Sequence, residues 1–261
     1  MSRPRALVLR TAGTNCDEET RHALELAGAD AERIHVNRLV REPGLLESAG
    51  LLVIPGGFSY GDDVASGKVL AVEIMALLAE RISAFVGRGG LALGICNGFQ
   101  VLVKTGLLPY AEARAAADRE FTLTHNDSRR FEARWVRLRA PSSCKCLFVE
   151  PGEEIELPVA HGEGKWVART PEAVKRLEDE GLVAYRYVGA DGNDDPVYPE
   201  DPNGSARHIA GVSDASGRIF GLMPHPERHV FPWHHPRFTR EARAGEGDGM
   251  RIFRRAVGLI R

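Results

Sequence analysis

The sequence predicts an α/β protein with a mostly parallel central sheet, helices on both faces of that sheet, and an antiparallel extension. In the first part of the chain, short apolar runs alternate with stretches of helical spacing, which is typical of parallel strands joined by crossover helices. In the middle, strand-like runs are separated by turn residues, which favours antiparallel pairing. We expect residues 1–261 to form one domain, because no Pro-, Gly- and Ser-rich linker, internal repeat or low-complexity tract divides them.

Four strand-like runs and three helical runs predict the parallel part. The expected strands are residues 6–9, 31–36, 51–54 and 91–95. A first helix is expected to be capped by Thr14 or Asn15 and to stop near Gly28. A second helix is expected over 69–86, and a third over 99–104. The second has apolar side chains at helical spacing, namely Val72, Met75, Leu78, Ile82 and Phe85.

The antiparallel extension is predicted from strand-like runs at 131–138, 154–159 and 183–188. Turns are expected between them at Pro141, at 151–152 and at 191–193. Further along, 218–223 has the composition of another buried strand. Residues 250–261 fit an amphipathic helix whose inward side chains are Ile252, Phe253, Val257 and Ile260.

Composition excludes several classes of protein. The net charge of −2 argues against a general nucleic-acid surface. No stretch approaches the roughly 18 apolar residues that span a bilayer, and the start of the chain lacks the apolar core of a signal peptide. Four cysteines in 261 residues do not make a disulfide framework. We therefore expect a cytoplasmic globular protein without membrane or nucleic-acid partners.

Cys96 is the main candidate for a reactive side chain. It lies in the segment 94–98 (Gly-Ile-Cys-Asn-Gly), between an apolar strand and a helical run. This pattern matches the nucleophile elbow of hydrolases, with cysteine in place of serine. Glycines flank the nucleophile because a Cβ two residues to either side would collide with the crossing strand and helix. The helix N-terminus favours the thiolate. A buried structural thiol is the alternative interpretation.

His225 and Glu227 are the candidate base and its orienting carboxylate. They follow the strand-like run 218–223, and prolines 224 and 226 hold this stretch extended. Because residues two apart share one face of an extended chain, the two side chains point the same way. Glu227 then fixes the tautomer of His225 while His225 takes the Cys96 proton. Alternatively, His225 merely fills a loop that the prolines fix.

Main-chain donors complete this predicted site. Gly56 and Gly57 directly follow the strand-like run 51–54, at the same sheet edge as Cys96. We expect the Gly57 and Asn97 N–H groups to form an oxyanion hole. On their own, two glycines after a strand are more often an ordinary turn.

Segments 55–57, 94–100 and 225–227 together resemble class I (triad-type) glutamine amidotransferases, which have a flavodoxin-like fold. Longer segments, spread over nearly the whole chain, are similar to the glutaminase subunits of phosphoribosylformylglycinamidine synthase, an enzyme of purine biosynthesis. These segments are 57–62, 126–136, 158–164, 201–205 and 221–228. The chain departs from the family pattern at 63–68, and 119–127 and 229–248 are hard to match.

The resemblance implies a glutaminase that works through a γ-glutamyl thioester on Cys96. It also implies that Gln100, Phe58 and the backbone around Gly162 hold the substrate glutamine. By the same resemblance, ATP and Mg²⁺ bind a separate large synthetase subunit that aminates formylglycinamide ribonucleotide, usually with a small bridging subunit. In agreement, the chain contains neither a phosphate-binding P-loop nor a dinucleotide fingerprint, so we expect no cofactor in it.

Two other functions stay open at this point. One is a different triad enzyme, either the glutaminase subunit of another amidotransferase or a stand-alone cysteine hydrolase. The other is a non-catalytic scaffold that only binds glutamine.

No metal site is expected. Cys144 and Cys146 lack ligand spacing and a second pair, and His229, His234 and His235 are expected in a solvated or partner-facing loop. Cys16 is expected to pack near the start of the first helix.

Overall fold

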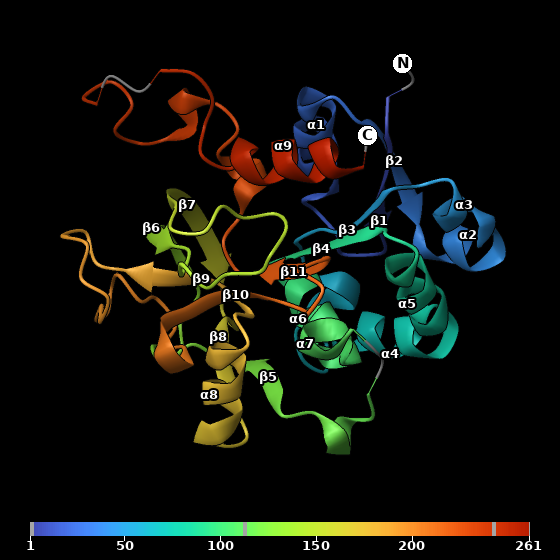
Figure 1. The fold of residues 1–261 in the computed structure, drawn as a ribbon, viewed down its shortest axis with the longest axis horizontal. Coiled ribbons are helices and arrows are strands. Elements are labelled where there is room, and N and C mark those ends of the chain that lie inside the picture. Colours follow the sequence, from blue (N-terminus) through green and yellow to red (C-terminus); the bar gives the residue numbers. More distant parts are fainter. Residues whose placement is uncertain (1–2, 112–113, 242–243, 261) are drawn as a thin grey trace.

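The computed structural model describes residues 3–111, 114–241 and 244–260. Its centre is a nine-stranded sheet with the strand order β2-β1-β3-β4-β11-β10-β9-β6-β7 (Figure 1). The first five strands in this order are parallel to one another. They are β2 (Asp30–His35), β1 (Arg5–Arg10), β3 (Leu51–Ile54), β4 (Leu91–Ile95) and β11 (Ile219–Leu222). The predicted parallel sheet is confirmed.

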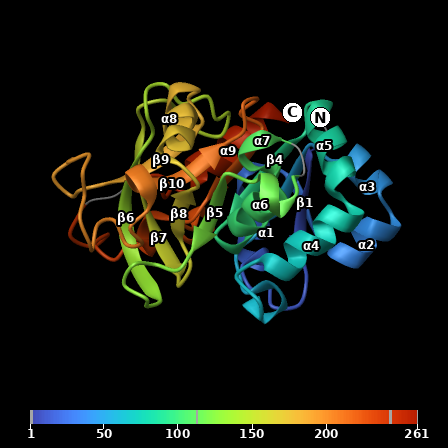
Figure 2. The ribbon, with the colours of Figure 1, turned by 90° about the horizontal axis from the view of Figure 1, so that it is seen from below.

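The other half of the sheet is antiparallel, as predicted. It contains β10 (Ile209–Ser213), β9 (Val183–Val188), β6 (Glu132–Arg139) and β7 (Glu154–His161). A separate two-stranded sheet pairs β5 (Phe121–Thr124) with β8 (Lys165–Ala168). The strands β5, β8 and β10 were not predicted from the sequence. Figure 2 shows β5 and β8 between α6 and the strands β6 and β7.

Helices cover both faces of the parallel half, as Figure 1 shows: α1 and α9 pack together on one face, and α4 and α6 pack on the other. The α-helices are α1 (Asp17–Ala27), α2 (Val36–Arg41), α3 (Gly44–Glu47), α4 (Lys68–Leu77), α5 (Ala79–Gly87), α6 (Asn97–Thr105), α7 (Leu107–Tyr110), α8 (Pro171–Asp179) and α9 (Met250–Leu259). The short 3₁₀ helices are η1 (Ser59–Asp62), η2 (Ala116–Asp118), η3 (Ala206–His208), η4 (Pro226–Arg228) and η5 (Pro232–His234).

The helix predicted over 69–86 is two helices, α4 and α5. The chain breaks at Leu78, whose φ of −131° is not helical. The break lets each helix turn its own apolar face inward: Ile74 and Leu78 are buried, whereas Val72, predicted to face the core, is exposed. Because the apolar spacing continues across Leu78, the sequence did not indicate that the chain changes direction there.

The ends of α1 and α9 differ slightly from the prediction. Cys16, rather than Thr14 or Asn15, occupies the N-cap position of α1 and makes no side-chain cap hydrogen bond. Gly28 ends this helix as predicted, with a left-handed φ of 101°. The last helix is confirmed up to Leu259, and position 261 of the prediction lies outside the described residues.

One continuous apolar core runs through both halves of the sheet. Trp166 of β8 connects the two parts, because its ring stacks on Phe99 of α6 at 5.7 Å and on Phe121 of β5 at 5.1 Å. The small sheet is thereby fixed against the helix that follows Cys96. No helix within residues 3–111, 114–241 or 244–260 is both long and apolar enough to cross a bilayer.

Candidate active site

Cys96 lies on a strained turn between β4 and α6. Its backbone has φ 50° and ψ −104°, a conformation that is rare for a residue with a side chain. Both flanking glycines are sterically required. A Cβ on Gly98 would lie 1.8 Å from the carbonyl oxygen of Ile54 in β3, and a Cβ on Gly94 would lie 2.7 Å from the carbonyl oxygen of Gly98 in α6. The packing therefore has the geometry of a nucleophile elbow.

His225 and Glu227 follow β11, which is hydrogen-bonded to β4. The Nδ1 atom of His225 and Oε1 of Glu227 lie 2.6 Å apart in a hydrogen bond, as the two-residue spacing predicts. The side chains are only 2% and 0% exposed. Burial lowers the pKa of His225, but the adjacent Glu227 carboxylate and Cys96 outweigh burial and raise that pKa well above its usual value.

Cys96 and His225 follow the paired strands β4 and β11 at the same end of the sheet. The Cys96 Sγ lies 3.8 Å from the carbonyl oxygen of Ala160 in β7 and donates toward it. Within the described part of the chain, the buried His225 Nε2 has no hydrogen-bond partner. Because Nδ1 is bonded to Glu227, Nε2 is the ring atom that remains to exchange a proton with the thiol.

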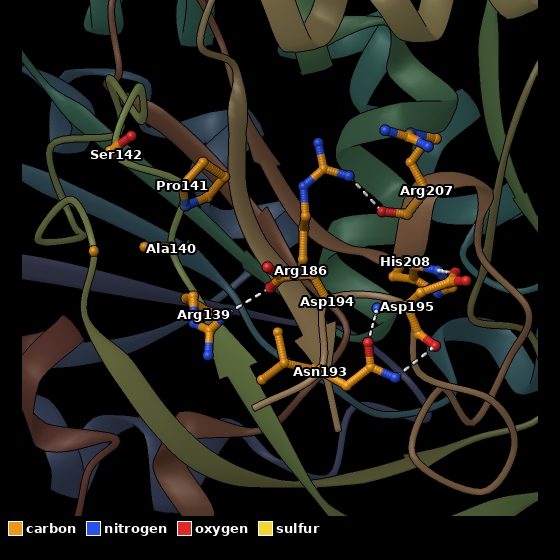
Figure 3. Close-up of a pocket in the computed structure, with 12 residues that line it drawn as sticks. Arg139, Ala140, Pro141, Ser142, Arg186, Asn193, Asp194, Asp195, Arg207 and His208 are labelled. Carbon is orange, nitrogen blue, oxygen red and sulfur yellow. Dashed lines mark hydrogen bonds and ion pairs between the residues drawn. The ribbon is translucent and has the colours of Figure 1, made fainter. Parts of the chain in front are cut away.

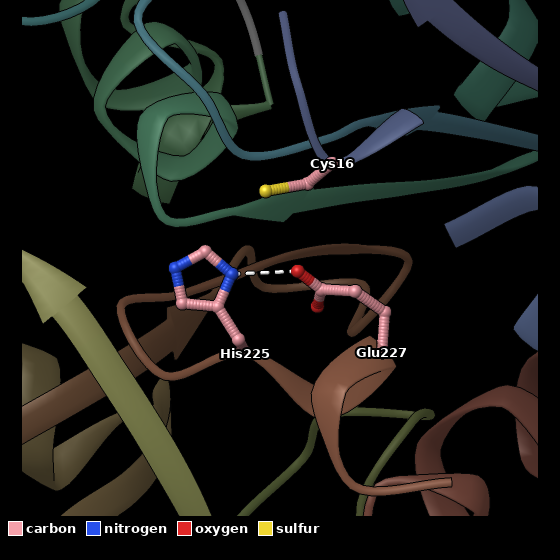
Figure 4. Close-up of side chains that lie close together, drawn as sticks. All are labelled: Cys16, His225 and Glu227. Carbon is pink, nitrogen blue, oxygen red and sulfur yellow. Dashed lines mark hydrogen bonds and ion pairs between the residues drawn. The ribbon is translucent and has the colours of Figure 1, made fainter. Parts of the chain in front are cut away.

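Cys16 is a site neighbour that sequence analysis did not identify. Figure 4 shows its sulfur beside the His225–Glu227 pair, and donor atoms of the three side chains lie within 4.8 Å of one another. Burial raises the pKa of Cys16 to about 11, so the thiol is neutral at neutral pH. The only hint in the sequence is the position of Cys16 in the loop after β1, since that loop runs beside Gly57 at the same sheet edge.

The loop after β3 has the backbone that the predicted oxyanion hole needs. Gly57 has a φ of +141°, and a Cβ there would lie 2.8 Å from the main-chain nitrogen of Asn15. Gly56 packs against the candidate base, because a Cβ on it would lie 2.8 Å from Cε1 of His225. Asn97 is the first residue of α6, and the N–H of a first helical residue has no acceptor within its own helix.

Gln100 lies next to the elbow, but its side chain is directed to protein groups. It is 3% exposed, its Oε1 accepts from Asn97 Nδ2 at 3.1 Å, and its Nε2 donates to the carbonyl oxygen of Glu163. Phe58 is half exposed and stacks on Phe131 at 6.4 Å. Among the described atoms, nothing lies within 4 Å of a Cβ built on Gly162, so space is free there. Of the three predicted substrate-binding residues, Gly162 borders free space, whereas Gln100 is buried and Phe58 is half exposed.

A buried polar network holds the loop that contains η1 against the elbow. The Asn97 side chain accepts from the main-chain N–H of Ser59 and donates to Asp62. Lys104 of α6 donates to the carbonyl oxygen of Ser66 at 2.7 Å. Glu163 accepts from the N–H of Ser66 at 3.3 Å, which ties the same loop to the end of β7. Burial lowers the pKa of Lys104.

His161 is a second buried imidazole beside the site. Its Nδ1 lies 3.1 Å from Asn126 Oδ1, and the Asn126 amide donates to two carbonyl oxygens, so Oδ1 is the acceptor and Nδ1 carries the proton. Burial, with a smaller effect of His225, lowers the pKa of His161 to about 3. His161 is therefore neutral, and it does not add positive charge around His225.

The loop after η4 differs from its prediction. His229 and His235 are buried rather than solvated, and both rings pack edge-on against Trp135 of β6. Trp233 of the same loop is exposed, as a solvated loop requires. Polar contacts hold both rings inward as well, since His229 Nδ1 lies 2.6 Å from the Glu156 carbonyl oxygen and His235 Nε2 lies 3.2 Å from the Glu156 carboxylate.

Two groups of described side chains bring possible metal-ligand atoms together. They are Cys16, His225 and Glu227, and, separately, Glu156, His235 and Glu241. Arg228 contacts the Cys16 sulfur at 3.1 Å, and Arg137 and Arg237 pair with Glu156 at 3.2 Å. Positive charges oppose a cation in both places, so we assign neither as a metal site. All four cysteines, including Cys144 and Cys146, are free thiols.

A cavity of about 740 Å³ lies elsewhere, on the antiparallel half (Figure 3). Its lining includes Arg139, Arg186, Arg207 and His208, with Asp194 nearby. The arginines are paired: Arg139 with Asp194, and both Arg186 and Arg207 with Glu178. None of the predicted site residues lines this cavity.

Comparisons with known proteins identify the family of the chain. The sequence profile of the CobB/CobQ-like glutamine amidotransferase domain matches residues 3–259. The chain is 47% identical over 261 residues to phosphoribosylformylglycinamidine synthase subunit PurQ of Dehalococcoides mccartyi, covering 100% of this chain and 99% of that protein. It is 40% identical over 266 residues to PurQ of Archaeoglobus fulgidus, covering 97% and 96% of the two chains.

Solved structures give the same result for the fold. One chain in the structure of PurLQS from Thermotoga maritima matches with a TM-score of 0.73 and 33% identity, covering 99% of this chain and 100% of that chain. A putative GMP synthase component from Thermoplasma acidophilum matches with a TM-score of 0.57 and 14% identity, covering 100% and 95% of the two chains. The second match supports the fold alone.

Proposed function

The chain belongs to the family of CobB/CobQ-like glutamine amidotransferase domains and, within it, to the PurQ subunits of phosphoribosylformylglycinamidine synthase; we propose that it hydrolyses glutamine through a Cys96–His225–Glu227 triad. The observation that carries this proposal is the buried His225–Glu227 hydrogen bond, which lies after a strand paired with the one that leads into the Cys96 elbow. Such a set activates a thiol for attack on a carbonyl carbon.

The first half of the proposed reaction forms a thioester. His225 takes the Cys96 proton at Nε2, and the thiolate attacks the side-chain amide carbon of glutamine. The N–H groups of Gly57 and Asn97 hold the resulting oxyanion, and loss of one such donor typically costs about 10²–10³ in rate. His225 returns the proton to the departing nitrogen, which leaves as ammonia, and a γ-glutamyl thioester remains on Cys96.

The second half releases glutamate. His225 accepts a proton from water, the hydroxide attacks the thioester carbon, and the C–S bond breaks. The proton stays on His225 beside the released Cys96 thiolate, so each turnover ends with the imidazolium, whose loss sets the alkaline limb of the pH profile. Glu227 stays ionised throughout and stabilises the imidazolium in each half-reaction.

The ammonia is proposed to pass to a large, ATP- and Mg²⁺-dependent synthetase subunit that aminates formylglycinamide ribonucleotide, with a small bridging subunit in the same complex. The PurLQS structure from Thermotoga maritima supports assembly with further subunits, since its name joins PurQ to others. The closed site supports dependence on a partner: Cys96 is 5% exposed, and the loop over it is tied down by Asn97, Lys104 and Glu163.

A covalent trap tests this proposal. A glutamine-mimicking diazoketone should add one equivalent to the protein, and peptide mapping by mass spectrometry should place it on Cys96. Cys96→Ala should lose the adduct, and the matched control Cys146→Ala, which removes another buried thiol, should keep it. An adduct that persists in Cys96→Ala, or that maps to another residue, would overturn the assignment.

A further inference from the structure

We infer that Cys16 and Glu19 hold Arg228 away from Glu227, and that this reserves the Glu227 carboxylate for His225. The inference rests on the proposed function, because it assigns positioning residues to the same triad. It gives Cys16 a role that packing at the start of α1 does not explain.

Glu227 lies between two competing cations. Its Oε1 is 2.6 Å from Nδ1 of His225 and 4.0 Å from Nε of Arg228. Its Oε2 is buried and has no hydrogen-bond partner within the described ranges. A carboxylate with an unused buried oxygen is a strong acceptor for a guanidinium, which binds both oxygens in one plane. Arg228, the next residue in the chain, would therefore compete with His225 if it were free to turn.

Two residues at the start of α1, Cys16 and Glu19, bind the Arg228 guanidinium instead. Its Nε donates to Glu19 Oε1 at 3.0 Å, and its Nη2 donates to the Cys16 sulfur at 3.1 Å. The Cys16 thiol in turn lies 3.2 Å from Asn15 Oδ1 and donates to it. A neutral thiol suits this place, since it accepts from the guanidinium without adding a second negative charge beside Glu227.

The charge around His225 then depends on where Arg228 lies. The titratable groups that face the imidazole are Glu227, Cys96, Cys16 and the neutral His161, with Arg228 behind the carboxylate. If Arg228 turned onto Glu227, the carboxylate would be shared and would stabilise the imidazolium less. The pKa of His225 would fall, and its ring would lose its fixed orientation.

The experiment uses the full chain in complex with its synthetase partner, and compares Cys16→Ala with Cys16→Ser. For Cys16→Ala, kcat for glutamine hydrolysis should fall by roughly 10- to 100-fold with KM nearly unchanged, as expected when a catalytic group is misplaced. The alkaline limb of its pH profile should move down by about one pH unit. Cys16→Ser keeps an acceptor for Arg228 and should stay close to the wild type.

Two further variants separate this role from simple loss of packing. In Cys16→Ala/Arg228→Gln the competitor is removed, so the alkaline limb should return toward its wild-type position. Glu19→Gln weakens the partly exposed ion pair between Glu19 and Arg228. It should move the alkaline limb in the same direction as Cys16→Ala does, but by less. A limb that does not move in Cys16→Ala, or that does not return in the double variant, would overturn the inference.

An NMR measurement that does not depend on catalysis distinguishes the positioning role of Cys16 from the triad function. The Nδ1 proton of His225 should give a downfield NMR resonance in the wild type, from its short bond to Glu227, and this resonance should weaken or shift upfield in Cys16→Ala. An unchanged resonance overturns the positioning role alone. A wild type that keeps this resonance but forms no diazoketone adduct overturns the triad function alone.

Discussion

The parallel and antiparallel halves of the sheet contribute to the site in different ways. In the parallel half, the carboxyl ends of β3, β4 and β11 bring Gly57, Cys96 and His225 to one edge, and backbone contacts fix their positions. In the antiparallel half, β7 and the turn after it lie against the site through the Ala160 carbonyl and the Glu163 side chain. The parallel half holds the proposed reacting groups, and the antiparallel half covers them.

The parallel half should therefore determine the proposed chemistry, and the antiparallel half should determine whether substrate can enter the site. Positions fixed by backbone packing tolerate almost no change, because neighbouring main-chain atoms cannot move aside. Side-chain hydrogen bonds such as those of Glu163 and Lys104 rearrange at lower cost. We therefore expect substitutions in the parallel half to abolish activity or folding, and events at the antiparallel half to regulate entry.

Glu227→Gln changes the parallel half of the site and should strongly reduce the rate of glutamine hydrolysis. Without the carboxylate, the imidazole loses its orienting acceptor and the charge that raises its pKa. The rate of glutamine hydrolysis should fall by about 10⁴-fold, as in a serine protease that loses the equivalent charge. The alkaline limb of the pH profile should move to lower pH, because removing a negative neighbour destabilises the imidazolium. Initial rates from about pH 5 to 10 measure both effects.

The control for that variant is Glu172→Gln, which neutralises an exposed glutamate on α8. It should leave the rate and the pH profile unchanged. A residual rate in Glu227→Gln close to that of the control would contradict the role of Glu227.

Gly98→Ala and Gly162→Ala compare the two halves directly. In the parallel half, a methyl group on Gly98 meets the Ile54 carbonyl at 1.8 Å. We expect this variant to lose about 3 kcal/mol or more of unfolding free energy. Near the end of β7, the described atoms leave open space around Gly162, so its variant should change stability by only about 0.5 kcal/mol. Urea titrations measure both, and equal losses would show that the halves are equally rigid.

Docking of the synthetase partner should raise the glutaminase rate. Cys96 is only 5% exposed and His225 only 2% exposed, so we expect glutamine to enter through a less populated, more open state. If that state is populated at roughly 10% or less, a partner that stabilises it raises kcat/KM by about tenfold or more. Steady-state rates with and without the partner measure this effect, and equal rates would overturn it.

The elbow geometry at Cys96 and the His225–Glu227 hydrogen bond were predictable from sequence because they depend on local backbone geometry. The glycines around Cys96 and the prolines around His225 mark backbone constraints that a sequence displays directly. Most of the parallel strands were predictable for a similar reason, since they are short apolar runs. Both features depend on neighbours only a few residues away.

The features that were missed depend on contacts between distant segments. Cys16 reaches the site only because the loop after β1 crosses beside Gly57, and no local pattern indicates that. The break at Leu78 was hidden because α4 and α5 both continue the apolar spacing. His229 was expected in a solvated or partner-facing loop and is buried against Trp135, a contact that only the assembled sheet creates.

The most direct test of the triad uses Cys96→Ala in the complex with the synthetase partner. Amination of formylglycinamide ribonucleotide is measured twice, once with glutamine and once with added ammonia as the nitrogen source. We predict that the glutamine-dependent rate falls by about 10⁶-fold, as for loss of a catalytic nucleophile, while the ammonia-dependent rate is unchanged. A glutamine-dependent rate that survives the substitution would contradict a role for Cys96 as the nucleophile.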